Sequence, residues 1–390
     1  MTPLLLDRRS LLGLSIGGVA LAYAGRAATQ SRGARPKLVV VIARGAMDGL
    51  SVTVPFDDPN YRALRGGLAR PAPGESGGVL ALGDGFGLHP ALTGLKALHA
   101  AGQMRFAPAV ATSDRGRSHF DAQDALENGG DGRRRLSDGW LNSSLVASGG
   151  GSKGLSIGVQ TPLILRGPAA TANWAPGGRI GSDDRIAMLL QDLYGVDPLL
   201  HDNLAQGLAT EALVSRDDAR LRPNDTEGLG RTVARLMAGD AGTDVVALSI
   251  DGWDTHTRQE SQMLRRLTDL DRLIGGLREG LGEQWGDTVL MVATEFGRTA
   301  RANGTLGTDH GTGSSVLLAG GALRRGGPIG DWPTLADSRL LEGRDLRPTL
   351  DARSIFKGVL RDHLGVDRAA LDTVVFPGSA AEAPAIEGLV

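Results

Sequence analysis

The 390-residue chain contains no cysteine. This absence excludes disulfide bonds, thiolate metal sites, a cysteine nucleophile and the unmodified catalytic cysteine of a sulfatase-type enzyme. Aromatic residues make up 4% of the chain, and the formal net charge is −2 with no basic tract. Proteins that bind nucleic acid usually present a basic surface, so the composition argues against a nucleic-acid partner.

Long apolar runs are also missing, apart from one near the amino terminus. The pair Arg8 and Arg9 precedes an apolar stretch at 11–23, and small residues follow it at Ala22 and Ala24. The stretch is short for a bilayer span. This order indicates a twin-arginine export signal at 1–29, with an uncleaved anchor as the alternative. We therefore expect a periplasmic or secreted protein, exported folded by the twin-arginine translocase, with no stable membrane span after cleavage.

The chain is rich in glycine, with 58 residues, many of them in predicted loops beside short β-branched runs. A mature chain of roughly 360 residues can bury a large core, and α/β folds of this size often form one domain. Buried parallel strands are predicted at 37–43, 244–250 and 288–293, and further strands at 105–110 and 316–319. We expect one α/β domain over 37–378, a cap-like insertion at about 130–240, and a disordered tail at 379–390.

Several predicted strands are followed by carboxylates and histidines. Asp251, Asp254 and His256 follow the strand at 244–250, and Asp309 and His310 lie together in a glycine-flanked turn. The carboxyl ends of parallel strands meet at one edge of a sheet, so these side chains are predicted to converge. Carboxylate with imidazole suits zinc, manganese or iron, and either Asp251 or Asp254 could join His256. The alternatives are a helix cap at Asp254 and a turn in which His310 bonds to the backbone.

Three further charged residues follow predicted strands. Asp48 lies after the first strand, where a carboxylate can meet a metal or a phosphate; the alternative is an Asp-Gly turn. Glu295 is a candidate base or ligand, and Arg298 a candidate clamp for an anion. For Glu295 and Arg298, the alternative is a structural ion pair.

Ser118 is the candidate nucleophile. It precedes a predicted helix and lies between Arg115, Arg117 and His119. Two guanidinium groups and a helix amino end would bind a dianion and favour an alkoxide. The alternative is a capping serine beside two surface arginines.

Taken together, the motifs resemble those of an exported protein family known as domain of unknown function 1501. The matching segments, in order between residues 38 and 378, are LVVVIARGAMDGLSVTVPFDDPNYRALR, LGDGFGLHPAL, RSHFDAQDALENG, DGWLN, DGWDTH, TEFGRT, NGTLGTDHG and VVFPG. That family is similar to a branch of the alkaline phosphatase and sulfatase superfamily. The resemblance covers nearly all of the mature chain.

The resemblance implies a three-layer α/β/α sandwich with a mostly parallel sheet, helical insertions and a metal site at the strand ends. It implies one or two divalent ions, which could be zinc, manganese, iron, magnesium or calcium. The ligands it implies are Asp48, Asp309 and His310 for one metal, and Asp251 or Asp254 with His256 for the other. Ser118 would lie between the metals. The implied reaction is hydrolysis of a phosphate or sulfate ester, on a small anionic ester or a cell-envelope polymer.

The chain departs from the family pattern in one place. Many relatives carry a further His or Trp just after Asp-His-Gly, where this sequence has Gly-Thr-Gly-Ser-Ser at 311–315. The only later histidine, His363, falls in a predicted helix. An incomplete second site leaves two interpretations: a metal-dependent ester hydrolase, or a non-catalytic periplasmic binding protein with an eroded metal site.

Overall fold

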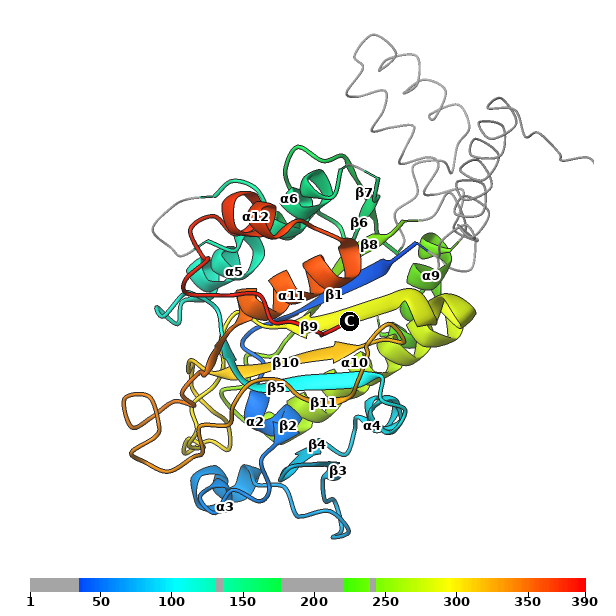
Figure 1. Cartoon of the computed structure of the whole chain (residues 1–390). Helices are drawn as coiled ribbons and strands as arrows, with labels where there is room; N and C mark the ends of the chain where they lie inside the picture. The colour runs from blue at the N-terminus through cyan, green and yellow to red at the C-terminus, as the bar shows by residue number, and fades with distance from the viewer. Residues whose placement is uncertain (1–34, 131–135, 150, 177–220, 223, 239–242) are drawn as a thin grey trace, which may run out of the picture. The chain divides into compact units, whose positions relative to one another are not determined.

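The computed structural model describes residues 35–130, 136–149, 151–176, 221–222, 224–238 and 243–390 (Figure 1). The predicted export signal and much of the predicted cap lie outside these ranges. Within them, no helix is both long enough and apolar enough to cross a bilayer.

A mixed central sheet organises the described residues. Its strand order is β11-β5-β10-β9-β1-β8-β6-β7, and β12 also pairs with β5. The strands are β1 (Lys37–Arg44), β5 (Met104–Ala111), β6 (Gly154–Ile157), β7 (Thr171–Trp174), β8 (Val245–Asp251), β9 (Thr288–Ala293), β10 (Ser314–Ala319), β11 (Gly327–Pro328) and β12 (Leu350–Asp351). The central strands are buried on both faces, which explains why they are nearly continuous apolar runs in the sequence.

Strand β10 runs against the direction of its neighbours. It pairs antiparallel with both β9 and β5, whereas β1 pairs parallel with β8 and β9. Strand β10 therefore begins at the edge of the sheet where β1, β5, β8 and β9 end. The segment before β10 and the loops after the other four strands meet at this edge.

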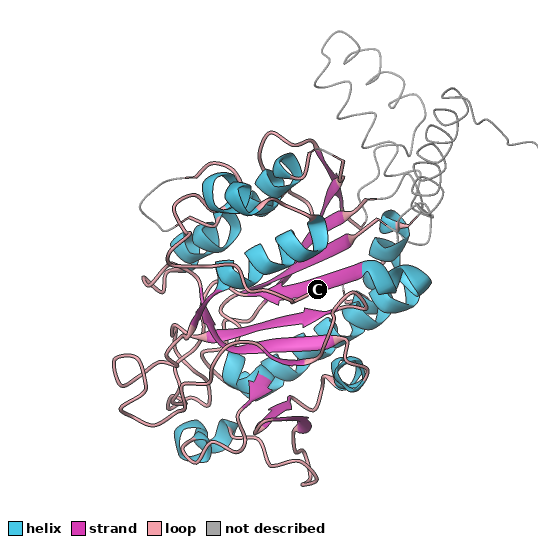
Figure 2. Cartoon of the chain, in the orientation of Figure 1, coloured by secondary structure: helices cyan, strands magenta, loops and turns pink. Residues whose placement is uncertain are grey.

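Helices cover both faces of the sheet (Figures 1 and 2). Those on one face are α4 (Thr93–Ala100), α9 (Thr226–Met237) and α10 (Gln259–Leu281), and those on the other are α5 (His119–Asn128), α6 (Trp140–Ala147) and α11 (Ala352–Leu364). Successive residues of β1 point to opposite faces: Val39 and Val41 join the first core, and Leu38 and Val40 join the second. The predicted α/β/α sandwich with a mostly parallel sheet is confirmed.

Smaller elements complete the described domain. A second sheet has the order β2-β4-β3 and is antiparallel. The short elements are α2 (Gly49–Val52), β2 (Thr53–Val54), α3 (Tyr61–Arg65), β3 (Leu80–Gly83), β4 (Phe86–Leu88) and α12 (Arg368–Ala370).

Two expectations about chain organisation differ from the structure. The described part of 130–240 is not a cap: β6 and β7 extend the central sheet beside β8, and α9 packs along α10. The predicted disordered tail instead packs on the domain, where Ala383 and Leu389 are fully buried. There the Ile386 backbone N–H donates to the Ser354 carbonyl over 3.1 Å. A few well-placed apolar residues anchor the tail, although its overall composition resembles a disordered segment.

His89 gives the fold a predictable pH dependence. Its side chain is buried, and this desolvation together with the nearby Arg70 guanidinium lowers its pKa to about 3. An unfolded histidine titrates near pH 6.5, so the unfolded chain takes up the proton first and stability falls as the pH drops from 6.5 towards 3. We expect this residue to cost about 2 kcal/mol between pH 7.5 and pH 5. Thermal unfolding of His89→Gln at both pH values should show a smaller acid shift than wild type; equal shifts would contradict the prediction.

Candidate metal centre

Asp254 and His256 reach the carboxyl edge of the sheet on the loop that follows β8. Trp253 anchors this loop, because its indole is fully buried and its N–H donates to the Ile250 carbonyl over 2.9 Å. The loop after β1 packs against it at Gly45, where a Cβ atom would lie 2.6 Å from the Asp254 backbone nitrogen. Glycine is therefore required at position 45 for the two loops to approach this closely.

His310 is held by a short antiparallel pairing between the segment after β9 and the segment before β10. Arg298 and His310 face each other across it. The Gly311 backbone N–H donates to the Gly297 carbonyl over 2.8 Å. A Cβ at Gly297 would lie 1.7 Å from the Gly313 carbonyl oxygen, so only glycine fits. The pairing places the His310 ring above the ends of β9 and β5.

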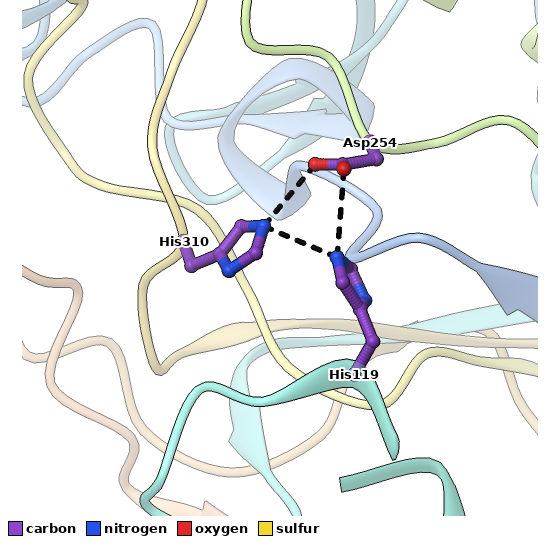
Figure 3. Close-up of side chains that lie close together, drawn as sticks. All are labelled: His119, Asp254 and His310. Carbon is purple, nitrogen blue, oxygen red and sulfur yellow. Dashed lines mark hydrogen bonds and ion pairs between the residues drawn. The ribbon is translucent and has the colours of Figure 1, made fainter.

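His119, the first residue of α5, completes the cluster (Figure 3). Its Nε2 lies 3.1 Å from His310 Nε2 and 3.5 Å from Asp254 Oδ2, and Asp254 Oδ1 lies 3.2 Å from His310 Nε2. His256 lies beside them, with its Nε2 3.1 Å from His310 Nε2 and 3.0 Å from Asp254 Oδ1. Asp309 lies farther out, with Oδ1 3.3 Å from His256 Nδ1. We call His119, Asp254 and His310 the metal centre.

The hydrogen bonds behind the two rings fix how the rings face the centre. Nδ1 of His119 lies 2.9 Å from Glu295 Oε1, and Nδ1 of His310 lies 3.1 Å from the Arg117 carbonyl oxygen. Both partners are acceptors, so each Nδ1 carries the proton of a neutral ring and each Nε2 presents a lone pair. Two lone pairs and the Asp254 carboxylate therefore point at one another, which is an arrangement that a cation stabilises.

The spacing of these atoms fits a metal ion. With metal–nitrogen bonds of about 2.0–2.1 Å, the ligand atoms of a tetrahedral zinc site lie about 3.3–3.4 Å apart. In the metal centre the two Nε2 atoms lie 3.1 Å apart, and the two Asp254 oxygens lie 3.2 Å from His310 Nε2 (Oδ1) and 3.5 Å from His119 Nε2 (Oδ2). Two imidazoles with a carboxylate suit zinc, manganese and iron alike.

Buried charges support the ligands from behind. Burial disfavours the Glu295 anion, but hydrogen bonds with His119, the Gly45 N–H and Gln123 hold its pKa below the ordinary value. The hydrogen bond that His119 donates to Glu295 raises the pKa of His119, so a bound cation would compete with a proton for Nε2 of this ring. Burial likewise opposes ionisation of Asp254, but Arg298, which donates to Oδ1 over 2.6 Å, brings its pKa below the ordinary value.

Protonation also favours a ligand role for His310. Burial is the main reason why its pKa lies below the ordinary value. The ring is therefore neutral near pH 7, as a metal ligand must be.

Glu295 and Arg298 thus have positions that differ from the predicted ones. Both are fully buried, and each binds a residue of the metal centre rather than facing open space. Arg298 forms the structural ion pair that the sequence left as its alternative, with Asp254 as its partner. The carboxylate–histidine pairing of Glu295 with His119 is typical of the second layer of a metal site, where it orients the ligand.

Asp48 lies apart from the metal centre. Its buried carboxylate forms an ion pair with Arg65, binds the Gln259 amide and caps α2 by accepting from the Leu50 N–H. Its neighbour Gln259 accepts hydrogen bonds from Thr255 and Thr308, which flank the ligand loops. In the structure Arg65, from α3, is the ion-pair partner of Asp48, and a ligand role for Asp48 stays a prediction.

The two arginines expected beside Ser118 are bonded to groups outside the metal centre. Arg115 donates to the carbonyls of Thr112 and Asp114, and Arg117 forms ion pairs of 2.8 Å with Glu342 and Asp345. Glu342 and Asp345 are more than two hundred residues from Arg117 in the sequence, so no local pattern predicts these ion pairs. Both guanidinium groups are thus already bonded to other partners, and the clamp for an anion stays a prediction.

Ser118, Asp251 and His363 also have defined positions. Ser118 immediately precedes His119 at the start of α5, and its side chain makes no capping hydrogen bond. Asp251, the last residue of β8, is exposed and lies outside the metal centre, so Asp254 is the carboxylate that converges with the histidines. His363 lies in α11 with its Nε2 2.9 Å from the carbonyl of Lys37, at the opposite edge of the sheet.

Comparisons with known proteins place the chain in a family. Among curated proteins, no sequence matches. Similar solved structures include the C-terminal periplasmic domain of EcEptC from Escherichia coli in complex with Zn (11% identity, 88% of this chain and 87% of that chain, TM-score 0.43). Others are an alkaline phosphatase from the Antarctic bacterium TAB5 (13%, 75% and 94%, 0.38) and the phosphonate monoester hydrolase of Agrobacterium radiobacter (10%, 85% and 74%, 0.41). The family model described as "Protein of unknown function (DUF1501)" matches residues 35–375, and the chain belongs to this family.

Proposed function

We propose that this protein is a metal-dependent hydrolase of phosphate or sulfate esters. The observation that carries the proposal is the convergence of His119, Asp254 and His310 with their lone pairs and carboxylate aimed at one point. Each of them makes a further hydrogen bond: His119 to Glu295, Asp254 to Arg298, and His310 to the Arg117 carbonyl oxygen. The resemblance of the sequence motifs to the alkaline phosphatase and sulfatase superfamily agrees with ester hydrolysis.

The residues around the metal centre have separate roles in this proposal. A bound divalent ion would polarise the ester oxygen and lower the pKa of a coordinated water or alcohol. Glu295 keeps the His119 ring in the tautomer that leaves Nε2 available, and Arg298 orients Asp254. Ser118 is the proposed nucleophile, because it adjoins His119 and its hydroxyl is not used to cap α5.

The charges near the metal centre favour a singly charged ester. Arg115 and Arg117 are engaged elsewhere, and Arg298 is committed to Asp254. The Asp309 carboxylate adds negative charge at the exposed side. A phosphate monoester dianion would be repelled more strongly here than a phosphodiester or a sulfate monoester. We therefore expect the last two classes to be the better substrates.

A substrate panel tests the function. We expect bis(4-nitrophenyl) phosphate or 4-nitrophenyl sulfate to be hydrolysed faster than 4-nitrophenyl phosphate by protein supplied with zinc, manganese or iron. Ser118→Ala should lower kcat by about a hundredfold or more while bound metal is unchanged. Ser261→Ala, on the exposed side of α10, is the matched control. An unchanged rate in Ser118→Ala would remove this residue from the mechanism.

The same panel addresses the non-catalytic interpretation. If metal-loaded protein turns over none of the three ester classes, the chain is better explained as an exported binding protein.

We also propose export through the twin-arginine pathway, for which the support is the Arg8–Arg9 pair and the apolar stretch after it.

A further inference from the structure

A cavity of about 660 Å³ lies beside the metal centre along α5. Helix α5 begins with His119, and its side chains Phe120, Gln123 and Asp124 line the cavity. Further lining residues are Ile157 at the end of β6, residues 158 and 160–163 after it, and Ser249 and Asp251 of β8. One helix thus contributes to both the metal centre and the cavity wall.

The cavity and the metal centre are joined through one carboxylate oxygen. Gln123 donates to Glu295 Oε1 over 3.2 Å, and the same oxygen lies 2.9 Å from His119 Nδ1. Arg44 reaches the cavity from the end of β1, and its guanidinium binds Gln123, Ser249 and Glu127. The inner wall is therefore rigid and already hydrogen-bonded, which suits a preformed binding site.

Unused polar groups face the cavity. The carboxylates of Asp124 and Asp251 line it, and neither makes an ion pair or side-chain hydrogen bond with any residue in the described ranges. Gln160 is an exposed lining residue. Such carboxylate and amide groups can accept or donate several hydrogen bonds to hydroxyl groups of a ligand.

An aromatic ring lies at the mouth of this cavity. Phe120, which lines the cavity, is 87% exposed. A flat ring next to hydrogen-bonding carboxylates suits a ligand with one apolar face and a rim of hydroxyl groups.

The charge of the cavity lining disfavours a strongly anionic occupant. The lining contains two cations, Arg44 and Arg166, and three anions, Asp124, Glu127 and Asp251, so its formal net charge is −1. Arg44 and Glu127 form an ion pair, which leaves the Arg166 guanidinium and the two carboxylates of Asp124 and Asp251. A phosphate or sulfate group would meet more negative than positive charge here, whereas an uncharged polyol carries no such penalty and can donate hydrogen bonds to both carboxylates.

We propose that this cavity binds a neutral sugar unit and, resting on the proposed function, that this unit is the alcohol part of the ester. The sugar would lay its apolar face on Phe120 and donate hydroxyl hydrogen bonds to Asp124 and Asp251. The ester bond would then extend past the start of α5 to the metal centre. The cavity would therefore select the leaving group, while the metal centre binds the charged group.

Direct binding tests the cavity without any turnover. Saturation-transfer NMR would be recorded on the full-length protein with maltotriose, cellotriose, chitotriose and methyl glycosides at up to about 10 mM. We expect at least one neutral sugar to bind, and Phe120→Ala to weaken its binding about tenfold. Val374→Ala, which truncates an apolar side chain that is 53% exposed elsewhere, should bind the sugar as wild type does. No sugar binding to wild type, or equal binding to Phe120→Ala, would overturn the proposal.

A second pair of measurements separates the cavity from the hydrolase proposal. Asp254→Ala should bind the sugar as wild type does, because the metal centre does not line the cavity. Asp124→Asn combined with Asp251→Asn should weaken the neutral sugar and improve binding of its sulfated counterpart; tighter binding of the sulfated sugar to wild type would overturn the charge argument. With an active enzyme, Phe120→Ala should lower kcat/KM about tenfold for a sugar ester and leave a methyl ester within about twofold. Sugar binding without any turnover would support the cavity and reject the hydrolase.

Discussion

Asp254→Ala is expected to leave the protein without its metal ion. Asp254 is the only carboxylate of the metal centre, and Arg298 already holds it ionised. Removing it leaves two neutral imidazoles and a buried guanidinium that would repel a cation. We expect wild type, purified without chelator, to contain about one equivalent of zinc, manganese or iron, and the variant to bind it at least a hundredfold more weakly. Elemental mass spectrometry after dialysis measures both.

Asp251→Ala is the matched control for this experiment. It removes a carboxylate from the same loop region, three residues earlier, but that carboxylate lies outside the metal centre. The control should therefore retain its metal. Metal loss in Asp251→Ala with retention in Asp254→Ala would reverse the assignment, and no metal in wild type even after zinc is added would contradict the metal centre itself.

Asp48→Ala is expected to destabilise the fold rather than to remove a ligand. Asp48 and Arg65 form an ion pair in which both side chains are almost completely shielded from solvent. Removing the carboxylate leaves the Arg65 guanidinium buried and unpaired, which costs about 3–5 kcal/mol. That is a large share of the total stability of an ordinary domain. Urea unfolding of wild type and variant, both stripped of metal, measures the difference.

The exposed pair of Arg301 and Asp337 provides the comparison. Their ion pair of 2.5 Å is open to solvent on both sides, so Asp337→Ala should cost less than about 1 kcal/mol. Were Asp48→Ala as stable as wild type but unable to bind metal, Asp48 would belong with the ligands, as the family resemblance implies.

The strands and the edge of the sheet could be predicted because they depend on local pattern. The predicted β-branched runs form β1, β5, β8, β9 and β10. Asp254, His256, Asp309 and His310 come together because they adjoin strand ends at one edge. The direction of β10 could not be predicted, since an apolar run has the same composition in either direction.

The remaining features depend on partners that are distant in sequence. His119 is 135 residues before Asp254, so no local motif joins the two residues. It also adjoins Ser118, which was the candidate nucleophile, and His119 was therefore not predicted as a ligand. Arg117 forms ion pairs with Glu342 and Asp345, and Asp48 forms one with Arg65 of the short helix α3. Residue type and spacing can indicate which groups are available, but pairing decides which of them stay free.

The reversed strand β10 would also set the order of events in which the chain acquires the proposed ion. It is inserted between β5 and β9, and its entrance carries His310, more than 190 residues after His119. Until this insertion occurs, the earlier part of the chain can offer His119 and Asp254 but not the third donor. Uptake of the ion during refolding would therefore occur only after β10 has paired with β5 and β9. Its rate should follow this slow, non-local strand pairing rather than diffusion of the metal.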